Sequence, residues 1–95
     1  MITHVVCFKL TDASAGHLAH CKALLEGLVG TVPTLRTMTV GLNVVTSPRA
    51  HDLVLIATYD DLDGLAAYRA HPKHVKIADH LVAGSQAIVS VDFES

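Results

Sequence analysis

The sequence predicts a single α+β domain, residues 1–95, with strands and helices in the order β-α-β-β-α(α)-β. A chain of 95 residues is too short for two domains. Stretches in which every second residue is apolar alternate with stretches in which apolar residues recur every three or four positions. With crossovers long enough to be right-handed, this order is the ferredoxin-like arrangement, a four-stranded antiparallel sheet with helices on one face only.

Four segments have the pattern of a strand. In residues 2–10 the even-numbered side chains share one face and the odd-numbered ones the other. Residues 35–45 and 86–93 alternate in the same way. Residues 53–59 form an unbroken apolar run, typical of a strand buried on both faces, and residues 46–49 are predicted to be the hairpin loop before it.

Three helical segments lie between these strands. The first is predicted to begin after Ser14 and to continue until Gly30 and Pro33 interrupt its apolar stripe. The second, residues 62–70, begins beside aspartates whose carboxylates suit the positive end of a helix dipole. Because proline fits the first turn of a helix and not its middle, a third helix is predicted over residues 72–83.

The composition is unusually apolar for this length. Hydrophobic residues make up 51% and charged residues 17% of the chain. A chain this short buries only about 60–65% of its unfolded surface, so apolar area is left over. We therefore expect a homodimer, in which two copies of the open sheet face cover each other to form a dimeric α+β barrel. The second strand and the segment around Phe93 are expected to contribute to the interface.

Charge and segment composition argue against other classes of protein. The formal net charge is −2 and like charges do not cluster, so nucleic acid is not an expected partner. No signal peptide and no apolar stretch long enough for a membrane span are recognisable. Cys7 and Cys21 lie in strand-like and helix-like segments rather than in loops, which favours inert packing roles and a reducing compartment. We expect a cytoplasmic protein.

The most informative stretch surrounds Pro72. Tyr68 lies near the end of one predicted helix and His74 in the first turn of the next, so the bend between them could turn both toward a common point. His4 lies on an otherwise apolar face of the first strand, which is central in a ferredoxin-like sheet and faces the helices. We expect these three side chains to converge on a dry pocket.

Together with other short motifs, this stretch resembles a known family, the stress-responsive A/B barrel (Dabb) domains of the dimeric α+β barrel superfamily. The resemblance spans essentially the whole chain. The motifs that carry it are His4-Val5-Val6, Phe8-Lys9, Val32-Pro33, Val40-Gly41-Leu42-Asn43, Asp52-Leu53-Val54-Leu55, Leu65-Ala66-Ala67-Tyr68, His71-Pro72-Lys73-His74-Val75 and Val91-Asp92-Phe93. The family includes a plant polyketide cyclase that works without a cofactor, plant hydroxynitrile lyases, and stress proteins with no established reaction.

The resemblance implies roles for individual residues. Tyr68 and His74 stand where the cyclase has its catalytic tyrosine and histidine, and His4 matches a further pocket histidine. An imidazole can take a proton at neutral pH, and a phenol can stabilise a developing oxyanion. The positions that the resemblance implies for substrate binding are Val6, Phe8, Cys21 and Leu25. Several of these differ in type from the cyclase, so substrate identity does not carry over.

Two functions remain open at this point. The chain is either a cofactor-free cyclase or lyase acting on a small carbonyl or polyketide-like substrate, or a non-catalytic dimeric module that binds a small ligand or protects under stress. Neither needs a metal or an organic cofactor. An oxygenase of the related antibiotic-biosynthesis type is a third alternative, disfavoured because the chain has no Trp and no cofactor motif.

The remaining histidines have simpler interpretations. His71 is predicted to cap the helix that begins at Pro72. His17 and His20 are three residues apart on the first predicted helix, as are His71 and His74, but no carboxylate or thiolate stands at a matching spacing. We therefore expect no metal site.

Two further features are interpreted as structural. Arg69, Lys73 and Lys76 are separated by helical spacing and are interpreted as a solvated helix face, although they could also attract an anionic substrate. Gly41 is isolated within a strand, which indicates a bulge or a close approach at the dimer interface.

Overall fold

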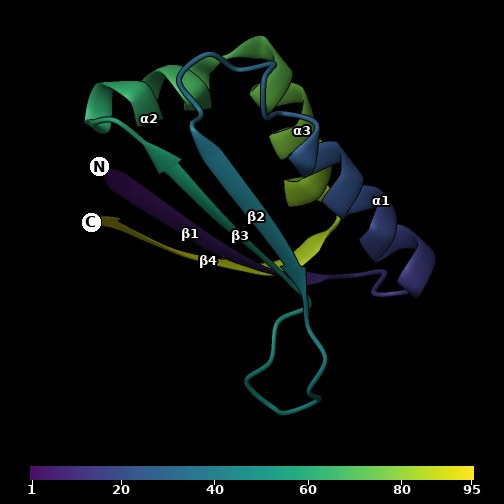
Figure 1. The fold of residues 1–95 in the computed structure, drawn as a ribbon. Helices are drawn as coiled ribbons and strands as arrows, with labels where there is room; N and C mark the ends of the chain where they lie inside the picture. The colour runs from purple at the N-terminus through teal and green to yellow at the C-terminus, as the bar shows by residue number, and fades with distance from the viewer.

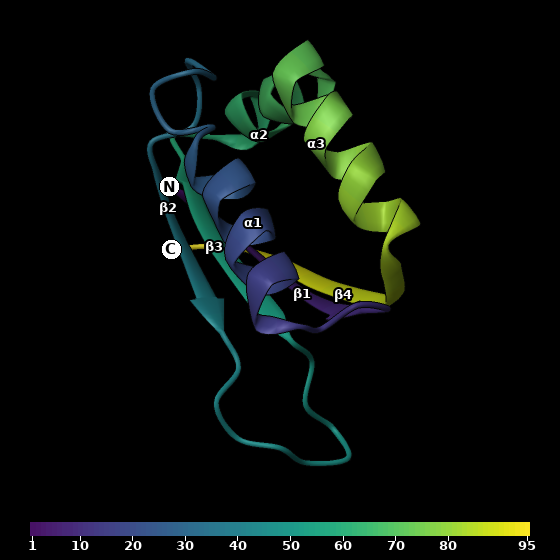
Figure 2. The same ribbon diagram turned by 90° about the vertical axis from the view of Figure 1, so that its right-hand side faces the viewer.

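The computed structural model describes all 95 residues and contains an antiparallel four-stranded sheet with helices over one face (Figures 1 and 2). The elements are β1 (Ile2–Leu10), α1 (Ala15–Glu26), β2 (Thr37–Leu42), β3 (Leu53–Tyr59), α2 (Leu62–Ala70), α3 (Pro72–Ala83) and β4 (Ser85–Glu94). The strand order is β2-β3-β1-β4, so β1 lies in the middle of the sheet. The predicted ferredoxin-like α+β fold is confirmed.

Side-chain caps set the start of α2 and the bend between α2 and α3. The Asp61 carboxylate accepts a hydrogen bond of 2.8 Å from the backbone N–H of Gly64. At the next helix the ring Nδ1 of His71 accepts one of 3.1 Å from the backbone N–H of Lys73, and Pro72 occupies the first turn. The capping role predicted for His71 is confirmed, and α2 and α3 have the predicted bounds.

Helix α1 is shorter than predicted. It ends at Glu26, and the chain then turns back through Gly30, whose φ of 82° lies in the left-handed region that glycine adopts without strain. Leu28 and Val32, which the periodicity placed on the helix, are nevertheless almost completely buried. The turns that follow α1 therefore carry the same apolar positions into the core without a helix.

The hairpin between β2 and β3 also differs from the prediction. Strand β2 has six residues, paired from Thr37 opposite Thr58 to Leu42 opposite Leu53, instead of the predicted 35–45. Because β3 begins only at Leu53, residues 43–52 have no continuous strand partner and form a longer loop than the predicted 46–49. Val44 in this loop is 93% exposed.

Of the two interpretations of Gly41, a bulge or a close approach at the dimer interface, the bulge is wrong. The register between β2 and β3 is regular through Gly41, and the irregularity in the sheet lies between Lys9 and Leu10, where β1 pairs with β4. A Cβ atom at Gly41 would lie 3.2 Å from Cγ1 of Val54 on the neighbouring strand. Glycine at this position therefore gives the Val54 side chain its space.

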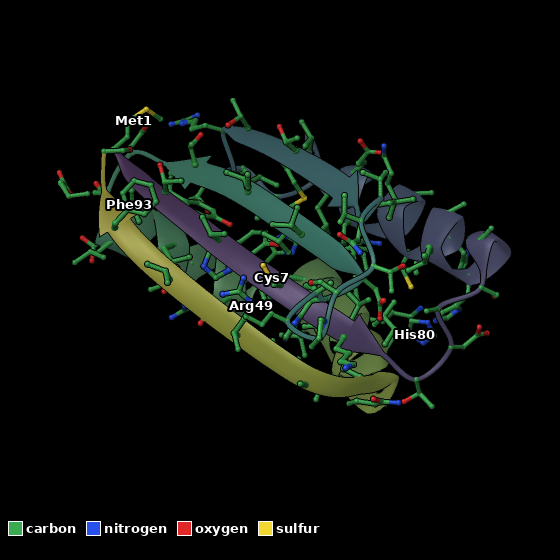
Figure 3. The ribbon with its side chains drawn as sticks, turned by 90° about the horizontal axis from the view of Figure 1, so that it is seen from below. Met1, Cys7, Arg49, His80 and Phe93 are labelled. Atoms are coloured by element: carbon green, nitrogen blue, oxygen red, sulfur yellow. The ribbon has the colours of Figure 1, made fainter.

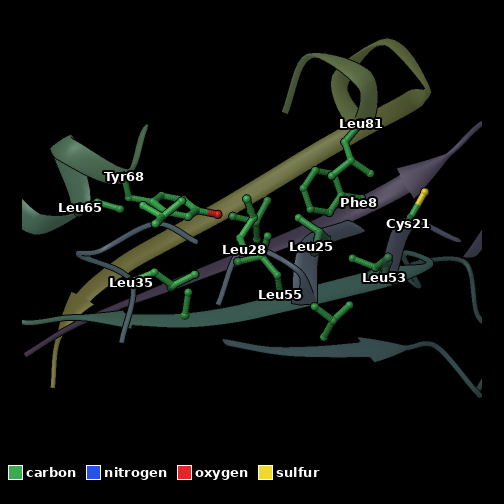
Figure 4. Close-up of a cluster of buried hydrophobic side chains, with 14 of the residues drawn as sticks. Phe8, Cys21, Leu25, Leu28, Leu35, Leu53, Leu55, Leu65, Tyr68 and Leu81 are labelled. Atoms are coloured by element: carbon green, nitrogen blue, oxygen red, sulfur yellow. The ribbon is translucent and has the colours of Figure 1, made fainter. Parts of the chain in front are cut away.

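The two faces of the sheet have different surroundings. The even-numbered residues of β1 point toward the helices and are buried in a core that fills the space between the layers (Figure 4). The opposite face has no covering element, and Figure 3 shows it with Cys7 on β1 and Phe93 on β4. Strand β3 was predicted to be buried on both faces, but on this open face its Ile56 is 40% exposed in the single chain.

The helices are short. The longest, α1 and α3, have 12 residues each. At 1.5 Å per residue they extend about 18 Å, against a hydrocarbon layer of about 30 Å. None of the helices is therefore able to cross a membrane.

Candidate functional site

A cavity of about 170 Å³ lies between the helices and the central strands. Its lining is apolar except for His4, His74 and Tyr68. The residues around it are His4, Val6, Phe8, Leu25, Leu55, Tyr68, His74, Ala78, Leu81, Val82 and Ile88. The structure therefore brings together the three candidate catalytic residues and three of the four candidate substrate-binding residues.

Cys21 is the candidate that the structure leaves outside this cavity. Its side chain is completely buried beneath α1, and its Sγ atom lies 3.6 Å from Nε2 of His17. Burial, together with the charge of Asp12, raises the pKa of the thiol, so the sulfur stays protonated at neutral pH. Cys21 fills space in the core and does not face the cavity.

His4 is held in place by a carboxylate from the neighbouring strand. His4 lies opposite Asp92 in the pairing of β1 with β4, and its Nδ1–H donates a hydrogen bond to Oδ1 of Asp92. The other oxygen of Asp92 accepts a hydrogen bond of 3.0 Å from Arg69 on α2. Because Nδ1 is engaged in this way, the nitrogen of His4 that remains for a ligand is Nε2.

The charge of Asp92 is preserved at neutral pH. Burial alone would raise the pKa of this carboxyl, but the hydrogen bond and charge of His4 and the charge of Arg69 outweigh it and lower the pKa below its ordinary value. The carboxylate is therefore the acceptor that holds the Nδ1–H of His4 in place.

His74 has the properties of a base that is ready at neutral pH. Its half-buried ring donates a hydrogen bond of 3.2 Å from Nδ1–H to the backbone carbonyl of Arg69. A carbonyl oxygen can only accept, so the lone pair of the neutral ring lies on Nε2. Burial lowers the pKa of His74, with a contribution from the charges of His4 and Arg69, and outweighs the hydrogen bond to the Arg69 carbonyl, which acts in the opposite direction. The neutral form is therefore the main one at pH 7.

Tyr68 lines the same cavity, and its hydroxyl is buried. Its ring centroid lies 4.2 Å from that of His74 and 5.1 Å from that of Tyr59, and its side chain is almost completely buried. The two rings pack against each other, and no hydrogen bond joins the Tyr68 hydroxyl to His74. Figure 4 shows the Tyr68 hydroxyl directed into the buried cluster rather than toward solvent.

The Tyr68 hydroxyl has no well-formed hydrogen bond within the protein. Burial raises its pKa to about 12, so the phenol remains protonated and is a hydrogen-bond donor at neutral pH. The neighbouring Tyr59 hydroxyl is also buried without such a bond, and burial raises its pKa as well. The two tyrosine hydroxyls interact with each other, and this interaction lowers the pKa of Tyr68 less than burial raises it.

Sequence reasoning missed Asp92, Arg69 and Tyr59. Arg69 was interpreted as part of a solvated face, yet it joins α2 to β4 through Asp92. The alternation of residues 86–93 placed Asp92 on one face of its strand, but only the register with β1 puts it opposite His4. A charged residue on the helix-facing side of a strand was the one available signal.

No group of three or more His, Cys, Asp or Glu side chains is arranged to hold a metal ion. The chemistry that the cavity itself offers is a neutral imidazole base, a protonated phenol and a second imidazole held by a carboxylate. Such a set can remove a proton beside a carbonyl group and stabilise the negative charge that develops on its oxygen.

The sequence of the chain matches a known protein family. A family model described as the stress responsive A/B barrel domain (Dabb) matches residues 2–95. No curated protein matches the chain significantly.

Solved structures share the fold. A dimeric protein of unknown function from Bacteroides fragilis is 26% identical, with a TM-score of 0.78 over 99% of this chain and 95% of that one. A hydroxynitrile lyase from Passiflora edulis is 15% identical, with a TM-score of 0.83 over 97% and 90%. SnoaB, a cofactor-independent oxygenase from Streptomyces nogalater, is 19% identical, with a TM-score of 0.76 over 99% and 91%. Because the family model spans nearly every residue, the chain belongs to the stress-responsive A/B barrel (Dabb) domain family.

Proposed function

We propose that this protein is a cofactor-independent enzyme of the lyase or cyclase type, which transfers a proton on a small carbonyl compound bound in the cavity. The observation that carries the proposal is that His4, Tyr68 and His74 line one cavity whose other walls are apolar. An imidazole that is neutral at pH 7, a protonated phenol and a second imidazole beside one apolar cavity are the parts that acid–base chemistry on a carbonyl compound needs.

Each polar group has a distinct task in the proposed reaction. Nε2 of His74 takes a proton from the carbon beside the carbonyl, or from the hydroxyl of an adduct. In the second case the oxygen electrons form the carbonyl, the carbon–carbon bond breaks, and the carbon group that leaves with the bonding electrons takes the proton from His74. The Tyr68 hydroxyl donates a hydrogen bond to the carbonyl oxygen as negative charge develops on it. His4, fixed by Asp92, presents Nε2 to the substrate and helps to position it.

The size of the cavity narrows the substrate class. An apolar cavity of about 150 Å³ accommodates a benzene molecule. A volume of about 170 Å³ therefore suits a carbonyl compound with one ring or a short aliphatic chain. The Passiflora edulis lyase supports the proposal through its shared fold alone.

Proton exchange tests this function without knowledge of the natural substrate. The protein is incubated in D₂O with phenylacetaldehyde or acetophenone, and deuterium uptake at the carbon beside the carbonyl is followed by NMR. Cleavage of mandelonitrile to benzaldehyde, followed by absorbance, covers the lyase reaction. We expect at least one of these reactions to exceed the buffer rate.

The opposite result identifies the alternative function. If one-ring carbonyl ligands shift the NMR signals of cavity residues while neither exchange nor cleavage rises above the buffer rate, the protein is a non-catalytic binding module. The small, mainly apolar cavity is the observation that favours this second candidate.

The pH dependence of the reaction follows from His74. Its pKa lies below the ordinary value of 6.5, mainly because the ring is buried. A base must be unprotonated, so the rate is expected to stay on its plateau through pH 7 and to fall only as the pH drops through this lowered pKa. A rate–pH profile from pH 4.5 to 8.5 checks this. A midpoint above 6.5 would contradict the assignment of His74 as the base.

We also propose that the protein is a homodimer joined through the open sheet face. The exposed apolar side chains on this face come from β3 and β4, and include Ile56, Val91, which is 63% exposed, and Phe93. A contiguous apolar face of this kind is normally covered in a stable protein. The Bacteroides fragilis relative, which is 26% identical, is described as dimeric and supports this proposal.

A charge placed on this face is expected to separate the two copies. Wild-type protein should elute with the mass of a dimer in size-exclusion chromatography with light scattering, and Val91→Glu should shift it to a monomer. Val29→Glu places the same charge on an exposed valine away from the sheet and should leave the dimer intact. A wild-type monomer at micromolar concentration would exclude this interface.

A further inference from the structure

A second hollow, of about 420 Å³, lies between α1 and α3. Figure 2 shows both helices over the same face of the sheet. The lining residues are His20 and Leu24 from α1 and Lys73, Lys76, Ile77 and His80 from α3. We call this hollow the α1–α3 groove. It shares no residue with the cavity that contains Tyr68.

The groove concentrates basic side chains. Lys73, Lys76, His20 and His80 are four of its six lining residues, and no carboxylate is among them. None of these four side chains takes part in an ion pair. The ion pairs of the structure lie outside the groove. The chain as a whole has a formal net charge of −2, so this local excess of basic groups is not a reflection of overall composition.

The arrangement of the donors favours a single compact anion. The rings of His20 and His80 approach each other edge to face from the two helices, with centroids 6.2 Å apart. Lys73 and Lys76 stand three residues apart on α3, which places them on neighbouring positions of one helix surface. Leu24 and Ile77 add apolar surface beside these four donors.

We propose that the α1–α3 groove binds the phosphate group of a phosphorylated organic molecule. Lys73, Lys76 and the ring N–H groups of His20 and His80 contact the phosphate oxygens. Leu24 and Ile77 contact the organic part. Several separate point-like donors suit the three oxygens and double charge of a phosphate, whereas a lone carboxylate is more typically held by the planar fork of an arginine.

Titrations with ADP and phenyl phosphate as probes test this site. Both contain a phosphate on an organic group, and adenosine and inorganic phosphate serve as the two partial probes. Binding is followed by isothermal titration calorimetry and by NMR shifts of α1 and α3 residues. We expect at least one organic phosphate to bind at least 10-fold more tightly than inorganic phosphate, and adenosine not to bind.

Matched lysine variants locate the site. Lys76→Gln removes a charge inside the groove, and Lys22→Gln removes one from α1 outside it. The first should weaken binding about 10-fold, and Lys73→Gln combined with Lys76→Gln should weaken it further. Lys22→Gln should keep wild-type affinity. Equal losses in Lys76→Gln and Lys22→Gln would show general charge attraction and overturn the proposal.

Two other outcomes would also overturn it. The first is the absence of binding by both organic phosphates at millimolar concentration. The second is loss of binding in Tyr68→Phe with retention in the Lys73→Gln, Lys76→Gln double variant, since this would place the ligand in the cavity. Because the two hollows share no residue, failure of the groove proposal leaves the proposed carbonyl chemistry intact, and the reverse also holds.

Discussion

Replacing His74 with alanine is expected to lower the rate of proton exchange or cleavage on a one-ring carbonyl substrate by about 10²- to 10⁴-fold, the usual contribution of a general base. The loss arises because His74 is the half-buried imidazole that is neutral at pH 7 and has Nε2 free. Initial rates at saturating substrate measure it. Circular dichroism and the dimer mass should be unchanged.

Tyr68→Phe tests the contribution of the hydroxyl to the rate separately from that of the ring. It removes one oxygen and keeps the packing against His74 and Tyr59, so the fold should persist. The rate should fall about 10²- to 10³-fold, as when one donor to an oxyanion is lost.

A matched histidine tests whether the effects are specific. His51→Ala, in the loop before β3, replaces a histidine that does not line the cavity and should keep the wild-type rate. Full activity in both His74→Ala and Tyr68→Phe would show that these side chains are structural.

Leu53→Ala is expected to destabilise the protein by about 2–5 kcal/mol, the range for truncating a buried leucine. Leu53 is 2% exposed, at the start of β3 in the core between sheet and helices. At roughly 4–8 °C per kcal/mol for a domain of this size, the loss in Tm is about 8–40 °C. Urea and thermal unfolding at one fixed protein concentration measure it, since a dimer's stability depends on concentration.

Val44→Ala is the control for this substitution. Val44 is 93% exposed in the loop between β2 and β3. The free energy of unfolding of the protein should therefore change by less than about 0.5 kcal/mol. A loss below about 1 kcal/mol in Leu53→Ala would mean that the core around β3 rearranges to fill the space, contrary to the close packing expected of protein interiors.

Local sequence patterns determined most of the architecture of this protein. The predicted bounds are correct for β1, β3, α2 and α3. The spacing of apolar residues and the residues that end an element, such as Pro72 between the two helices, act over only a few positions. The side of a strand on which a residue lies also follows from local alternation. Alternation therefore placed His4 among the helix-facing residues. Tyr68 and His74 could be paired because the same short bend carries both.

Only the tertiary structure decided where segments distant in the sequence meet. The end of α1 and the length of β2 depend on where the chain turns and where its partner strand begins, which no local period encodes. Asp92 lies opposite His4, and Arg69 reaches Asp92, because of strand register and helix placement. The spacing of Lys73 and Lys76 in the sequence predicted a solvated face of α3. The packing of α1 beside α3 places His20 in the same groove. Alternation assigns a side chain to a face, whereas its neighbours on that face follow from how the whole chain closes on its core.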